Sequence, residues 1–208
     1  MTGKRTWSKL AVLALAATAL PLAAQEPHPT CKHCEATYIS KSELDAYTKR
    51  AVENHIVDQQ VRSLDIGKAQ IGIGMVTRGK LQPGGANSGE AVAEHEQVSE
   101  VYYVIDGAAT LLTGPDLVDP KLRPSTLRTV REQNGPGYSS QAIKNPVTHE
   151  LKAGDMIVIP AGVGHWFTRI DDHITYAMVR IDPDKVVALK NEAQSKAYLA
   201  SPATPETR

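Results

Sequence analysis

The sequence lacks several features that would narrow its function at once. It has no basic surplus, because 23 lysines and arginines balance 23 aspartates and glutamates. Without a basic block, nucleic acid and anionic membranes are poor candidate partners. It also contains no internal repeat of fixed period, which argues against a repeat architecture. What remains is a chain of 208 residues, a length that suits one domain with a sizeable core.

A membrane-spanning run is missing from the N-terminal end. The apolar stretch at residues 10–20 is too short to cross a bilayer. It follows a positively charged start and precedes "PLAAQ", which offers a cleavage site after Ala24. This pattern predicts a secretory signal peptide over residues 1–24, with an uncleaved anchor as the alternative. The mature protein is therefore expected to be periplasmic or secreted and not embedded in a membrane.

Cysteine is scarce, and both cysteines lie in one tetrapeptide, "CKHC", at Cys31 and Cys34. An exported protein can keep a disulfide, so we expect these two residues to be bonded to each other. Free thiols and a metal or redox role are the alternatives. A redox role is disfavoured because no βαβ pattern surrounds the motif, and a haem site because Glu35 follows Cys34.

Short strands separated by turn signals dominate the rest of the chain. A capping box at Ser40 and Glu43 and apolar residues at helical spacing predict a helix over residues 41–57. Asp106-Gly107 predicts a hairpin, and residues 115–147 read as a long loop with one short strand near Leu127. Four segments are expected: the signal peptide, an N-terminal segment with the helix (25–60), an all-β domain (61–183), and a C-terminal helix with a loose tail (184–208).

The stretch "GDMIVIPAGVGHWF" combines a buried strand with a sharp turn and a histidine. Pro160 stops the strand because it cannot donate to a ladder, and Gly162 permits a turn. His165 then opens the next strand. An earlier block, "GEAVAEHEQVSEVYYVIDG", likewise places His95 and Glu100 near strand residues between glycines.

Together the two blocks resemble the two signature motifs of the cupin superfamily. The second block matches at every position except the last, where Arg169 replaces an asparagine. The first block matches at His95 and Glu100 but has one histidine where the family has two, with either Gln97 or Ala93 in the other place. The resemblance implies an RmlC-like double-stranded β-helix, or jelly-roll barrel, whose interior can hold a ligand.

Strand alternation supports a site in that interior. Glu100, Tyr102 and Val104 share one strand face, and His165, Phe167 and Arg169 would share another. Buried charges are costly unless they are paired or bound to metal. We therefore expect His95, Glu100 and His165 to bind one divalent metal, which could be Fe, Mn, Zn or Ni. We expect Gln97, Phe167 and Arg169 to contact substrate. Arg169 would either hydrogen-bond an acidic group of the substrate or pair with Asp171 or Asp172.

Two classes of function follow from this reading. The first is an exported metal-dependent enzyme for a small oxygenated or carboxylated molecule, in which Glu100 and Tyr102 are catalytic. Its reaction would be an elimination or isomerisation, since the Glu100-Val101-Tyr102 spacing is similar to that of small cupin lyases, with an oxygenase as a variant. The second is a module that binds a sugar or acid without metal. The resemblance also allows a homodimer formed through the barrel sheets.

Overall fold

The computed structural model describes residues 30–31, 34–81 and 92–202. The expected signal peptide and most of the expected tail lie outside them. The architecture is mainly β, with these elements in chain order: α1 Lys41–Glu53, β1 Asp58–Asp65, β2 Gln70–Leu81, β3 Val92–Ala93, β4 Ser99–Gly114, β5 Leu117–Val118, β6 Lys121–Leu122, the π-helix η1 Val130–Asn134, β7 Tyr138–Ser140, β8 Ala142–Ile143, β9 Val147–Lys152, β10 Met156–Ile159, β11 Gly164–Asp182 and α2 Glu192–Ala200.

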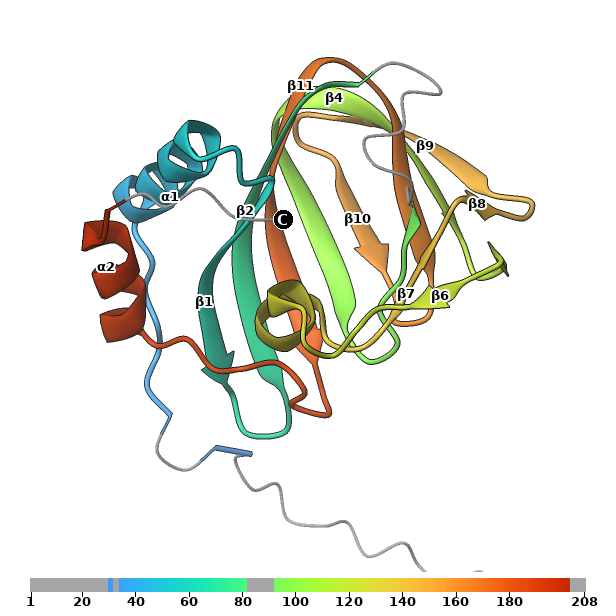
Figure 1. Ribbon diagram of the computed structural model, residues 1–208. Coiled ribbons are helices and arrows are strands. Elements are labelled where there is room, and N and C mark those ends of the chain that lie inside the picture. Colours follow the sequence, from blue (N-terminus) through green and yellow to red (C-terminus); the bar gives the residue numbers. More distant parts are fainter. Residues whose placement is uncertain (1–29, 32–33, 82–91, 203–208) are drawn as a thin grey trace, which may run out of the picture.

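Two long bent strands, β4 and β11, organise the jelly roll (Figure 1). They pair antiparallel with each other along most of their length. The second half of β11 also pairs with β2, which in turn pairs with β1. The first half of β4 pairs with β10 and its second half with β9. The fold class is thus the double-stranded β-helix expected from the sequence.

The hairpin expected at Asp106-Gly107 is wrong. β4 runs through this dipeptide as one strand, and Gly107 pairs with Ile174 of β11. Gly107 has a φ of 80°, and a Cβ atom there would collide with the carbonyl oxygen of His173. The glycine therefore permits a sharp bend within β4, where the backbone of β11 approaches closely. It does not mark a chain reversal.

The segment after β4 is more structured than the loop expected there. It contains the short strands β5 to β8, and residues near Leu127 form a turn that leads into η1. The strand expected near Leu127 is therefore wrong. β6 and β7 extend the sheet beyond β3, so the segment between β4 and β9 packs against the end of the barrel that carries His95.

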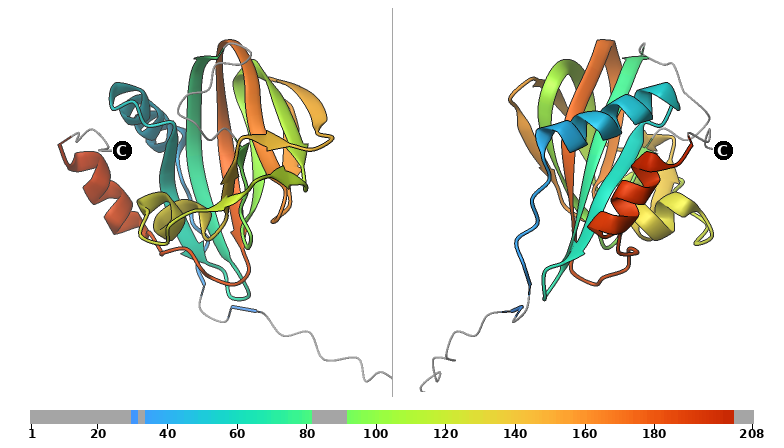
Figure 2. Two further views of the ribbon diagram at one scale, coloured as in Figure 1. Left: turned by 45° about the vertical axis from the view of Figure 1, so that its right-hand side comes forward. Right: turned by 90° about the vertical axis from the view of Figure 1, so that its left-hand side faces the viewer.

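Two helices cover the outer face of β1 and β2 (Figures 1 and 2). α1 begins where expected, with the Ser40 side chain accepting from the backbone N–H of Glu43, but it ends at Glu53, before the expected Val57. Asn54 caps it, and His55 adopts a left-handed φ of 56°. Of the C-terminal helix expected to begin after residue 183, only the last part, α2, is helical. Among the described residues, no helix is long and apolar enough to cross a membrane.

Two apolar clusters hold these layers together. The larger fills the interior between β2, β4, β9, β10 and β11, and the smaller lies under the helices around Tyr47, Val61 and Met75. Near the N-terminus of the described chain, Cys31 and Cys34 form a disulfide with their Cα atoms 5.6 Å apart.

Candidate metal centre

The two motif blocks meet at one end of the barrel interior. His95 lies in the turn between β3 and β4. Glu100 lies near the start of β4, and His165 lies near the start of β11. The turn after Pro160 is tied to the first block, because the backbone N–H of Gly162 donates to the His95 carbonyl at 2.8 Å. This contact explains how two segments far apart in sequence fix one cluster.

The three side chains form a compact buried cluster. Nε2 of His95 lies 3.4 Å from Oε1 of Glu100, and Nε2 of His165 lies 3.5 Å from Oε2. One ligand atom from each residue lies within 4.8 Å of the others. A four-coordinate metal with bonds of about 2.1 Å would set its ligand atoms roughly 3.4 Å apart. His95, Glu100 and His165 therefore fit a divalent ion in their spacing.

His165 is prepared for a metal. Its Nδ1–H donates to the Val163 carbonyl at 3.3 Å, which leaves the lone pair of Nε2 facing Glu100. Burial lowers the pKa of His165 to about 4, although the Glu100 carboxylate opposes this shift. The ring is therefore neutral at neutral pH, as a metal ligand must be.

His95 is held in the opposite way. Nη2 of Arg123, just after β6, donates to Nδ1 of His95 at 2.9 Å and to the Glu94 carbonyl. Because a guanidinium can only donate, Nδ1 of His95 accepts and the ring proton resides on Nε2. That proton points toward Oε1 of Glu100. Sequence reasoning missed Arg123, which no motif marks.

Glu100 is satisfied on both oxygens. Tyr102 Oη donates to Oε2 at 2.7 Å, and Arg180 Nε donates to Oε1 at 3.2 Å. Burial would raise the pKa of Glu100, but its contacts with His95, Arg180 and His165 hold the pKa well below its usual range. Arg180 in turn bonds Gln60 at 2.9 Å and pairs with Asp58. Glu100 is therefore an ionised carboxylate inside a connected network.

Tyr102 is a buried phenol that keeps its proton. Burial and the neighbouring Glu100 carboxylate raise its pKa well above the usual value. Its ring centroid lies 4.5 Å from that of Tyr176 and 6.4 Å from that of Phe167. Phe167, one of the three residues expected to contact substrate, thus forms part of the apolar wall behind the cluster.

The expected inward placement of Arg169 is wrong. The register of β11 against β4 shifts between Phe167 and Arg169, so one extra residue resets the side-chain alternation. Ile170 faces the core instead, only 1% exposed. Arg169 is exposed and pairs with Asp171 through two hydrogen bonds of 2.8 Å, the alternative considered from sequence.

Gln97 also points away from the cluster. Its amide nitrogen donates to the Asp184 carboxylate at 3.4 Å on the exposed side. A role for Gln97 as a substrate contact therefore has no geometric support. The three residues of the cluster remain its ligand candidates among the described residues.

The comparisons with known proteins agree with this geometry at the level of family. A cupin family model matches residues 57–204, a wider range than the all-β segment expected from sequence. A search of curated proteins gave no match.

Solved structures resemble the chain only distantly. A Bacillus halodurans protein is 14% identical, with 79% of this chain and 97% of that chain covered and a TM-score of 0.39. An RmlC-like cupin from Methanocaldococcus jannaschii is 12% identical, covering 62% and 84%, with a TM-score of 0.35. The DMSP lyase of Ruegeria pomeroyi is 14% identical, covering 61% and 50%, with a TM-score of 0.35. None of these likenesses bears on activity, but the family match spans more than half of the sequence, and this chain belongs to the cupin family.

Proposed function

We propose that this protein is an exported, metal-dependent cupin enzyme that acts on a small oxygenated or carboxylated molecule. The observation that carries the proposal is the buried His95–Glu100–His165 cluster, whose ligand atoms have metal-like spacing. A divalent ion held there would act as a Lewis acid on a carbonyl or carboxylate oxygen.

Tyr102 is the proton-carrying group of the proposed reaction. Its raised pKa keeps the phenol protonated, so it holds a proton at Oη next to the Glu100 carboxylate. A phenol in that place can donate a proton to a developing anion, which suits an elimination or isomerisation. Phe167 and Tyr176 exclude water from one side of this proton.

A metal-free binding module is the second candidate, and one observation favours it. Glu100 accepts hydrogen bonds from Tyr102 and Arg180 within the protein, and Arg123 holds His95 in the tautomer unsuited to a metal. Metal analysis of purified protein, before and after incubation with Mn²⁺, Fe²⁺, Zn²⁺ or Ni²⁺, separates the two. Stoichiometric metal that His165→Ala abolishes supports the enzyme, and no metal under any condition supports the binding module.

Export to the periplasm or the medium is part of the proposal, and the Cys31–Cys34 disulfide is consistent with an oxidising compartment. N-terminal sequencing of protein recovered from its native compartment tests this. A chain starting near Gln25 supports export, whereas an intact Met1 in the cytoplasm contradicts it.

Self-association is the last part of the proposal. On the outer face of β4 and β10, Tyr103 is 47%, Met156 64% and Val158 60% exposed. An apolar sheet face of this kind suits a homodimer. Sedimentation of wild-type protein and Val158→Lys tests it: a dimer that the lysine converts to monomer supports the proposal, and a wild-type monomer contradicts it.

A further inference from the structure

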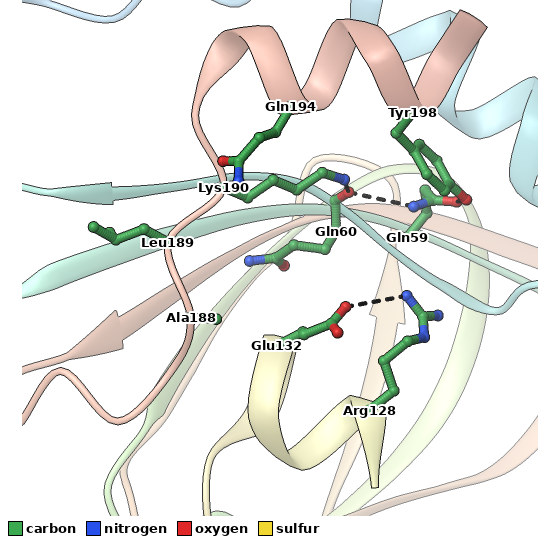
Figure 3. Close-up of a pocket in the computed structure, with 9 residues that line it drawn as sticks. All are labelled: Gln59, Gln60, Arg128, Glu132, Ala188, Leu189, Lys190, Gln194 and Tyr198. Atoms are coloured by element: carbon green, nitrogen blue, oxygen red, sulfur yellow. Dashed lines mark hydrogen bonds and ion pairs between the residues drawn. The ribbon is translucent and has the colours of Figure 1, made fainter. Parts of the chain in front are cut away.

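A cavity lies away from the metal-ligand cluster, between β1, η1 and α2 (Figure 3). This flank pocket has a volume of about 300 Å³, which suits a small ligand. Most of the residues that line it carry a polar group, and the full set is Gln59, Gln60, Arg128, Glu132, Ala188, Leu189, Lys190, Gln194 and Tyr198. Figure 3 shows Lys190 and Gln194 on one side of the space, with Glu132 and Arg128 facing them.

Lys190 is the part-buried cation of this pocket. Its Nζ donates to the backbone carbonyl of Gln60 at 2.7 Å and lies 4.5 Å from the ring centroid of Tyr198. Among the described residues, no carboxylate forms an ion pair with Lys190. The ammonium has three hydrogens, and one protein acceptor uses only one of them.

The surroundings of Lys190 are electropositive. Burial and nearby cations, of which Arg128 has the largest effect, lower the pKa of Lys190 to about 8, although the Glu132 carboxylate opposes this shift. Lys190 therefore remains mostly charged at neutral pH. A part-buried charge with no carboxylate in direct contact is costly, and an anion bound on Lys190 would reduce that cost.

The other lining groups indicate what accompanies the anion. The carboxamides of Gln59 and Gln60 are each fixed by protein hydrogen bonds but retain donor and acceptor capacity. The Gln194 carbonyl oxygen accepts from the backbone of Asn191 in the capping box of α2, and its NH₂ group is oriented by that bond.

We propose that the flank pocket binds a small hydroxylated carboxylate, with its carboxylate on Lys190 and its hydroxyl groups on the glutamine amides. Arg128 pairs with Glu132 at 3.5 Å, whereas Lys190 forms no ion pair with a described carboxylate. A single carboxylate on the ligand would therefore pair with Lys190. The site is separate from the His95–Glu100–His165 cluster and does not depend on metal.

The test is isothermal titration with three probes: gluconate, glucose and inorganic phosphate. Gluconate should bind, and NMR should show shifts of the Leu189 methyl groups and the Gln194 side-chain amide. Glucose, which has hydroxyl groups but no charge, should bind at least tenfold more weakly. Phosphate binding as tightly as gluconate would overturn the carboxylate assignment, and gluconate that does not bind or shifts only barrel residues would overturn the site.

The gluconate affinities of four variants distinguish binding in the flank pocket from a general charge effect and from binding in the barrel. Lys190→Gln should weaken gluconate at least tenfold, whereas Lys152→Gln, at an exposed lysine on β9, should leave it unchanged. Should Lys190→Gln fail to fold, Arg128→Gln should still weaken gluconate several-fold by reducing the local positive charge. His165→Ala should not change gluconate affinity even if it abolishes metal binding. Equal affinities in wild type, Lys190→Gln and Arg128→Gln would overturn the proposal.

Discussion

Arg123 donates a hydrogen bond to Nδ1 of His95 across 2.9 Å, so His95 and His165 present opposite tautomers to Glu100. His165 offers a bare Nε2, and His95 offers an N–H. A histidine that binds metal through Nε2 usually donates its Nδ1–H to a carbonyl or carboxylate. His95 faces a cation there instead, so metal loading requires the loss of its Nε2 proton or the displacement of Arg123.

Replacing Arg123 with glutamine should therefore strengthen metal binding. The glutamine carbonyl can accept from Nδ1–H, which frees Nε2 for the metal. Outer partners of metal-bound histidines typically change affinity by about 10–100-fold, and we expect an increase of that order. Competition against a chelator measures the affinity. Arg131→Gln, at an exposed arginine in η1, is the matched control and should have no effect.

A metal-free readout accompanies this prediction. Nitrogen-15 NMR of the imidazole rings should show His95 protonated on Nε2 in wild type and on Nδ1 in Arg123→Gln. An Nδ1–H tautomer in the wild-type protein, or an unchanged metal affinity in the variant, would contradict the role given to Arg123.

Tyr102→Phe should destabilise the protein through Glu100. The variant keeps the ring that packs on Phe167 and Tyr176 but removes the hydrogen bond to a buried carboxylate. A lost hydrogen bond to a charged group costs about 1.5–3 kcal/mol. Urea unfolding compares it with Tyr103→Phe, where the tyrosine is 47% exposed and little change is expected. Equal stabilities of the two variants would show that the hydrogen bond contributes little.

Stability of the metal-free protein should fall on mild acidification, with His165 as one cause. The pKa of His165 is about 4 in the folded protein and ordinarily 6.5. Between these values the unfolded state binds more protons, so the free energy of unfolding decreases as pH falls from 6.5 toward 4. The full effect is on the order of 3 kcal/mol. His165→Asn should flatten this part of the profile. A profile in His165→Asn as steep as that of wild type would rule out this origin.

Gly107→Ala should be far more damaging than Gly154→Ala. Both glycines have a positive φ, 80° and 90°, so both variants carry the strain of a left-handed backbone, roughly 1 kcal/mol. A Cβ at Gly107 also collides with the His173 carbonyl, whereas a Cβ at Gly154 meets open space. Thermal unfolding should rank wild type above Gly154→Ala and both well above Gly107→Ala. Similar losses in the two variants would argue against a close approach at the β4 bend.

The sequence predicted the features that depend on short, local patterns. The turn from Pro160 to His165 could be read correctly because proline and glycine restrict or release the backbone locally. The capping of α1 at Ser40 could be read for the same reason. The Asp106-Gly107 dipeptide has the same kind of local signal, yet the pairing of Gly107 with Ile174, far along the chain, turned it into a bend within one strand.

Features set by long-range register could not be predicted. Arg169 follows His165 at an even spacing, which places it inside only if β11 is regular, and the shift after Phe167 reverses its direction. Arg123 lies in the segment between β4 and β9, where no sequence pattern indicates that the chain returns to His95. Its position depends on Gly137, whose carbonyl accepts the Arg123 backbone N–H at 3.0 Å and where a side chain would collide with the Glu94 carbonyl.

The central claim is that His95, Glu100 and His165 form one metal site, and metal stoichiometry tests it most directly. Purified protein should be stripped with a chelator, incubated with each of Mn²⁺, Fe²⁺, Zn²⁺ and Ni²⁺, freed of unbound ion and analysed by mass spectrometry of the elements. We predict one tightly held ion per chain for at least one metal, and its loss in His165→Ala and Glu100→Gln. A folded wild-type protein that retains none of these ions, or a His165→Ala variant that retains the same ion in full, would contradict the account.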